Sequence, residues 1–141
     1  RPGRYQLEAA IQSAHCARAH TGHTDWAALR RLHRGLLRMA PSLGAVVALA
    51  AVEAQIDGPR AGLAALEAID DAAVTRFQPA WATRAHLLAN AGRNAEAATA
   101  YRRAIDLTGD AGVLEYLRRR LAAVGREDTT ADTPGSVGGP P

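Results

Sequence analysis

A glycine corner divides residues 78–109 into two alanine-rich segments, and this stretch constrains the fold more than any other. Glycine is unfavourable inside a helix but favoured just past its end, where it adopts the left-handed conformation that closes the last turn. Gly92 therefore ends one helix, and a second helix begins almost at once. Small residues let two helices approach closely, while larger residues fill the gaps beside them. The stretch predicts a closely packed helix pair.

The spacing within this pair matches the tetratricopeptide repeat, in which helix pairs recur about every 34 residues. With Gln78 as the first residue of a repeat, its packing positions are Trp81, Ala85, Leu88, Gly92, Ala97, Tyr101 and Ala104. Arg84 departs from the pattern, because leucine is usual there, and Gly109 stands where proline often closes the unit. Earlier segments fit more loosely, at Ala50, Gly62, Leu66 and Ile69. The alternative is an irregular helical bundle.

The whole chain favours an all-α fold. Only 4% of its 141 residues are aromatic, so the core has to be built from Ala, Leu, Val and Ile, which suits packed helices. Apolar spacings of three and four predict about seven helices, in tetratricopeptide-like antiparallel pairs that form a right-handed superhelical stack over residues 1–124. Their expected starts include Thr24 or Asp25, Pro59, Pro79, Asn94 and Asp110. Residues 125–141 have little to bury, and we expect a disordered tail there.

Four segments in the same order resemble the C-terminal extension of one group of bacterial extracytoplasmic-function (ECF) sigma factors, over about residues 2–121. They are GRYQLEAAIQSAH at 3–15, TDW at 24–26, IDGPRAGLAALEAI at 56–69 and WATRAHLLANAGRNAEAATAYRRAIDLTGD at 81–110. In that family the extension is a tetratricopeptide-like helical domain that follows a promoter-melting domain and a helix-turn-helix domain. Neither of those domains is present in this sequence.

The resemblance implies a regulatory domain that modulates transcription initiation by protein contact. Its expected partners are RNA polymerase or the sigma factor's own upstream domains, with promoter DNA bound only through those upstream domains. The chain starts without methionine, as RPGRYQ, and we interpret it as a piece of a longer protein. A free-standing peptide-binding adaptor is the alternative, and neither reading predicts an oligomeric state.

Arginine supplies all 17 basic residues, and the formal net charge is +3. Arg30, Arg34 and Arg38 recur at a spacing of four and predict a basic row on one helix. Such a row is either a solvated helix face or a contact for phosphate or an acidic protein surface. Asp57 and Arg60 flank a tight corner, where Asp57 is expected to accept backbone N–H bonds of the next helix. We treat these five residues as candidate interaction sites.

A possible metal or small-ligand sensor is suggested by His15, Cys16, His20 and His23. Zinc requires three or four converging ligands, which this spacing does not readily supply. The alternative is a buried thiol beside exposed imidazoles. The sequence therefore predicts no metal and no cofactor.

Catalytic patterns are missing from the sequence. It has no glycine-rich phosphate loop, no Ser-His-Asp order with a supporting context and no paired carboxylates on one helix face. We therefore do not expect an enzyme. The single Cys16 excludes an internal disulfide, and no apolar run is long enough to cross a bilayer. These features predict a cytoplasmic protein without a membrane contact.

Overall fold

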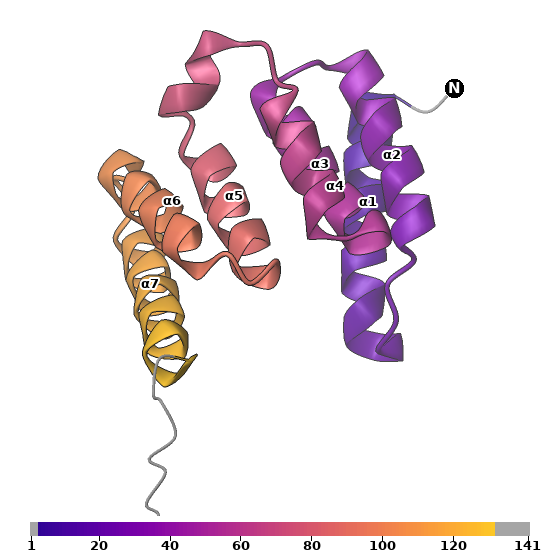
Figure 1. Cartoon of the computed structure of the whole chain (residues 1–141). Coiled ribbons are helices and arrows are strands. Elements are labelled where there is room, and N and C mark those ends of the chain that lie inside the picture. Colours follow the sequence, from indigo (N-terminus) through magenta and orange to yellow (C-terminus); the bar gives the residue numbers. More distant parts are fainter. Residues whose placement is uncertain (1–2, 132–141) are drawn as a thin grey trace, which may run out of the picture.

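The computed structural model describes residues 3–131, apart from the side chains of 17–21 and 131, and this range is helical without strands (Figure 1). The helices are α1 (Arg4–Thr21), α2 (Trp26–Met39), α3 (Leu43–Asp57), α4 (Pro59–Glu67), α5 (Gln78–Asn90), α6 (Asn94–Leu107) and α7 (Ala111–Ala131), with a 3₁₀ turn, η1 (Ala72–Arg76), before α5. Each helix packs against the next in sequence, and α3 also contacts α5. The prediction of an all-α stack of helix pairs is confirmed.

Local signals explain where most helices begin. Asp25, Ser42 and Asp110 each accept a hydrogen bond from the backbone N–H three residues later, at 2.9, 3.1 and 2.9 Å. These bonds satisfy N–H groups that have no partner within the helix. Pro59 and Pro79 lie in the first turns of α4 and α5, where a missing N–H costs nothing.

Three details of the secondary structure differ from the sequence prediction. Asn94 is the first residue of α6 rather than its cap, which is Arg93. The turn η1 was not predicted; it is stabilised by Asp71, whose carboxylate accepts the N–H of Ala73 at 2.9 Å. Helix α7 continues through 125–131, where a disordered tail was expected, and Thr129 donates to the carbonyl of Gly125 at 3.0 Å in that segment. Residues 132–141 lie outside the described range.

The main core contains residues from every helix from α3 through α7 and is built largely from alanine and leucine. Five of the residues assigned to repeat packing are buried in it: Ala85, Leu88, Ala97, Tyr101 and Ala104. Gly92 has a φ of 75° and forms the left-handed corner between α5 and α6. Trp81 is only partly buried against the same core. The small residues lie where α5 and α6 approach each other.

A second, smaller cluster holds the N-terminal helices. Ile11 of α1, Leu29 of α2 and Val52 of α3 are buried together. Partly buried side chains surround them: Ala14, Trp26, Leu32, Leu36 and Ile56. Helix α3 therefore contributes to both clusters and connects the first helix pair to the rest of the stack.

The packing at Ala97 provides a test of the repeat alignment. Ala97 is fully buried, so its replacement by leucine is expected to lower the free energy of unfolding by about 1–3 kcal/mol through overpacking. Ala95→Leu, at an exposed position of the same helix, is the matched control and is expected to change stability by less than about 0.5 kcal/mol. Urea denaturation followed by circular dichroism measures both. Equal stability of the two variants would contradict the alignment.

Candidate functional site

A groove lies between α3 and α5 and is bordered by α1, α2 and α7. We call it the α3–α5 groove. It has a volume of about 460 Å³. Its lining residues are His15, Trp26, His33, Ala48, Ala51, Val52, Gln55, Ala82, Thr83, His86, Leu87 and Tyr116. The groove thus collects one face of α3 and one face of α5, together with two side chains from α2 and one each from α1 and α7.

This groove presents apolar surface with a few uncharged polar groups. None of the described residues that line it is Asp, Glu or Arg. Ala51 and Ala82 leave room above the helices, and Tyr116 is half exposed at the side contributed by α7. Mostly apolar concave sites with few polar groups bind apolar or uncharged partner groups. The arrangement is suited to binding rather than to acid–base or nucleophilic chemistry.

Two of the groove's histidines, His33 and His86, have lowered pKa values. His33 is 8% exposed, and burial lowers its pKa, with a smaller lowering from the nearby His15. Burial also lowers the pKa of His86, assisted by the positive charge of Arg120. Since an unperturbed histidine titrates near 6.5, His33 and His86 are neutral at pH 7. The groove therefore has little charge at neutral pH.

Two imidazole nitrogens at the groove lack hydrogen-bond partners. The Nδ1 atoms of His33 and His86 are buried and bond to no described residue. The Nε2 atom of His86 lies 3.3 Å from the amide nitrogen of Asn90, so that side of the ring is satisfied. Buried polar atoms are normally paired, and these two mark the groove as a place where polar groups remain to be satisfied.

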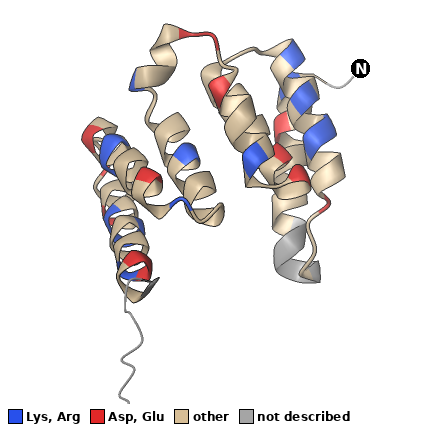
Figure 2. Cartoon of the chain, in the orientation of Figure 1, with Lys and Arg blue, Asp and Glu red and all other residues tan. Residues whose placement is uncertain are grey.

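Arginines recur along α2 (Figure 2). Two residues of the predicted row form ion pairs with α3. Glu53 accepts a hydrogen bond from Arg34 at 2.9 Å and lies 3.5 Å from the guanidinium of Arg30. Arg30 also lies 3.8 Å from Asp57. Arg38 is exposed and forms no ion pair with the described residues. Two of the three arginines thus connect α2 to α3, and none of them lines the α3–α5 groove.

The corner between α3 and α4 differs from its prediction. Gly58 is the N-cap of α4, with a φ of 95°, and no side chain bonds to the first N–H groups of that helix. Asp57, expected to accept those bonds, faces Arg30 instead. Arg60 is exposed on the first turn of α4. A structural role is sufficient to explain this corner, and neither Asp57 nor Arg60 lines the α3–α5 groove.

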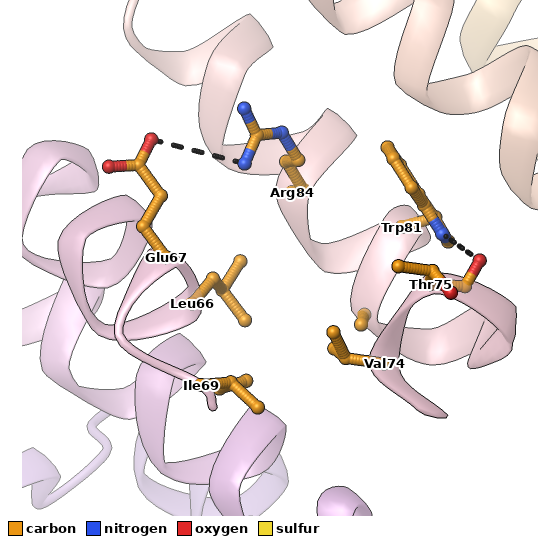
Figure 3. A pocket seen from close by; sticks show the side chains of 8 residues that line it. Leu66, Glu67, Ile69, Val74, Thr75, Trp81 and Arg84 are labelled. Carbon is orange, nitrogen blue, oxygen red and sulfur yellow. Dashed lines mark hydrogen bonds and ion pairs between the residues drawn. The ribbon is translucent and has the colours of Figure 1, made fainter. Parts of the chain in front are cut away.

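A smaller cleft of about 230 Å³ lies between α4, η1 and α5 (Figure 3). Leu66, Ile69 and Val74 line its apolar part. Trp81 donates a hydrogen bond from Nε1 to the carbonyl of Thr75 at 3.0 Å, so the polar atom of its indole is satisfied. A second contact crosses the rim of the cleft, where the guanidinium of Arg84 lies 3.9 Å from the carboxylate of Glu67. Arg84, the exception to the repeat pattern, therefore faces a charged partner instead of filling the core.

The described residues of the candidate metal site do not converge on one point. Cys16 is exposed, so the alternative of a buried thiol is wrong. His15 lines the α3–α5 groove, whereas His23 lies in the loop before α2. Among the described residues, no three His, Cys, Asp or Glu side chains lie close enough to hold one metal ion. The side chain of His20 lies outside the described set.

None of the helices between residues 3 and 131 combines the length and apolar character that crossing a membrane requires.

Comparison with known proteins finds a relative that matches most of this chain. The chain is similar to an uncharacterized protein of Rhizobium meliloti (strain 1021), with 34% identity over 130 residues. The matched region is 92% of this chain and 30% of that protein, so the chain spans less than a third of the relative's length. No protein-family model matches the chain, and no solved structure matches it.

Proposed function

We propose that this chain is the C-terminal regulatory, protein-interaction domain of an ECF sigma factor. It docks on the sigma factor's upstream domains or on RNA polymerase and thereby changes how readily a promoter is engaged. The four segments that resemble the sigma-factor extension motivate the identity of the parent protein. The single observation that supports the mode of action is the α3–α5 groove.

This groove has the character of a protein-binding site. Its lining is mostly apolar and contains no carboxylate or guanidinium from the described residues, so it favours apolar side chains over charged ones. Helix-pair stacks commonly bind other polypeptides along the surface formed by successive helices. Apolar side chains on one face of a partner helix would meet Ala51 and Ala82 at the floor of the groove.

The relative from Rhizobium meliloti supports a parent protein with further domains. Most of its length lies outside the match, which leaves room for the kind of upstream domains that the resemblance implies. A docking partner within the same polypeptide would act at a high effective concentration. Modest affinity at the groove would then be sufficient for regulation.

Ala51→Arg is expected to weaken docking at least about tenfold, because it places an unpaired cation in an uncharged groove. The test mixes purified chain with the separately produced upstream domains of the parent sigma factor, or with RNA polymerase, and measures binding by calorimetry. In reconstituted transcription, the same substitution in the full-length parent should shift promoter output in the same direction as deletion of residues 1–141.

Ala64→Arg is the matched control, since Ala64 is exposed on α4 and does not line the groove. Its binding and transcription should equal those of the unaltered protein. Unchanged promoter output after deletion of residues 1–141 would reject the proposed regulatory role. Equal binding by Ala51→Arg and the unaltered chain would reject the groove as the docking surface.

A further inference from the structure

Three histidines from three different helices line the α3–α5 groove. They are His15 of α1, His33 of α2 and His86 of α5. The remaining lining residues include no carboxylate, so the groove itself offers no counter-charge to an imidazolium. Histidine is the side chain whose charge changes most readily between pH 5 and 8. Of the three, His33 and His86 are the buried rings whose protonation would bring positive charge into the groove.

The groups around His33 and His86 also disfavour the protonated form of each ring. His33 lies near His15 and also lines a second cleft with Arg4 and Glu8 of α1, which pair with each other at 3.0 Å. An arginine and a carboxylate that is already paired give a protonated His33 little stabilisation.

His86 has a similar setting on the other side of the groove. From α7 it faces Arg120 and Tyr116, and on its own helix it contacts Asn90. A second cation beside Arg120 would be repelled rather than paired. The elements packed around both rings thus favour the neutral imidazole.

We propose that the α3–α5 groove is a proton-gated docking site, which holds an amphipathic helix by apolar and uncharged side chains and releases it when the groove histidines become protonated. This inference rests on the proposed function, and it assigns that helix to the upstream sigma domains. The absence of charge among the lining residues selects the occupant by complementarity, because a charged side chain would be desolvated there without a partner.

The sign of the pH effect follows from burial. A bound apolar helix covers the groove and removes water from the imidazoles, so it binds best when they are neutral. Protonation of His33 and His86 would leave two cations covered without counter-ions, and the occupied state would lose stability relative to the open one. Docking is therefore strong while His33 and His86 are neutral and weakens as the pH falls through their lowered pKa values. An occupant that presented carboxylates would show the opposite trend.

Nile red, an uncharged apolar dye, tests the groove without a protein partner. We expect the complete chain to enhance the dye's fluorescence at pH 7.5 and to lose at least about threefold in dye affinity at pH 5.5. His86→Gln should lose part of this pH dependence, and addition of His33→Gln should abolish it. His23→Gln, outside the groove, should retain it. Ala51→Arg reports whether the dye occupies this groove, and circular dichroism at both pH values confirms that each variant is folded.

Docking of the upstream sigma domains, measured in parallel, separates this inference from the proposed function. Weaker docking at pH 5.5 that becomes pH-independent in the double glutamine variant supports the proton gate. Dye binding that is absent at pH 7.5, or equal at the two pH values, overturns it even where the domains dock. A pH-dependent dye site with no docking at either pH overturns both the proposed function and the assigned occupant. Tighter docking at pH 5.5 overturns the uncharged chemistry of the occupant.

Discussion

Replacement of Gly62 by valine should destabilise the domain by about 3 kcal/mol. Gly62 lies on α4 at its crossing with α3 and α5, and it has no room for a side chain. A Cβ atom there would lie 2.7 Å from the Cβ of Ala54, 2.7 Å from Cδ1 of Leu87 and 2.9 Å from the carbonyl oxygen of Ala50. Real Cβ atoms do not approach so closely, and the carbonyl belongs to the backbone of α3, so the helices would have to separate.

Gly35→Ala is the control for this substitution. Gly35 lies on α2, where an added Cβ would meet Cδ1 of Leu7 at 3.5 Å, an ordinary contact. Alanine is favoured over glycine inside a helix, so this variant should be more stable than the unaltered chain by roughly 0.5–1 kcal/mol. Midpoints of urea unfolding measure both changes. If Gly62→Val unfolded at the midpoint of the unaltered chain, the close approach of α4 to α3 would be incorrect.

Leu29→Ala is expected to lower the free energy of unfolding by about 2–5 kcal/mol. The side chain of Leu29 is fully buried between Ile11 and Val52, at the centre of the smaller cluster. Removing three carbons there leaves a cavity among α1, α2 and α3. Thermal and urea unfolding followed by circular dichroism give the change in stability.

Met39→Ala serves as the comparison on the same helix. Met39 is 49% exposed, so its truncation should change the free energy of unfolding by less than about 0.5 kcal/mol. A similar loss of stability in both variants would show that the smaller cluster is not centred on Leu29.

Helices and most of their starts could be predicted from sequence because their signals are local. Asp25, Pro59 and Asp110 act on residues within one helical turn, and the glycine corner at Gly92 requires only its own backbone conformation. The turn η1 and the extension of α7 carry no comparable apolar signal. Both are largely exposed segments stabilised by side-chain bonds to nearby backbone, which composition does not distinguish from a loop or a tail.

The groove was not predicted residue by residue, because it depends on which faces of separate helices meet. A usable signal was present in the repeat spacing. Between the packing positions Trp81, Ala85 and Leu88, the intervening residues Ala82 and His86 face away from the partner helix and line the groove. By contrast, the row of arginines on α2 was visible in the sequence. Its partner Glu53 was not, since it lies on the next helix, 19 residues beyond Arg34.

Helix α3 belongs to both hydrophobic clusters, and this affects how the domain unfolds. In a linear array each unit depends mainly on its immediate neighbours, so one end can open while the other stays folded. Val52 packs α3 against α1 and α2, while Ala50 and Ala54 belong to the core that α3 shares with α4 to α7. The first two helices can thus detach as a unit, and in doing so they would carry His15, Trp26 and His33 away from the remaining wall of the groove.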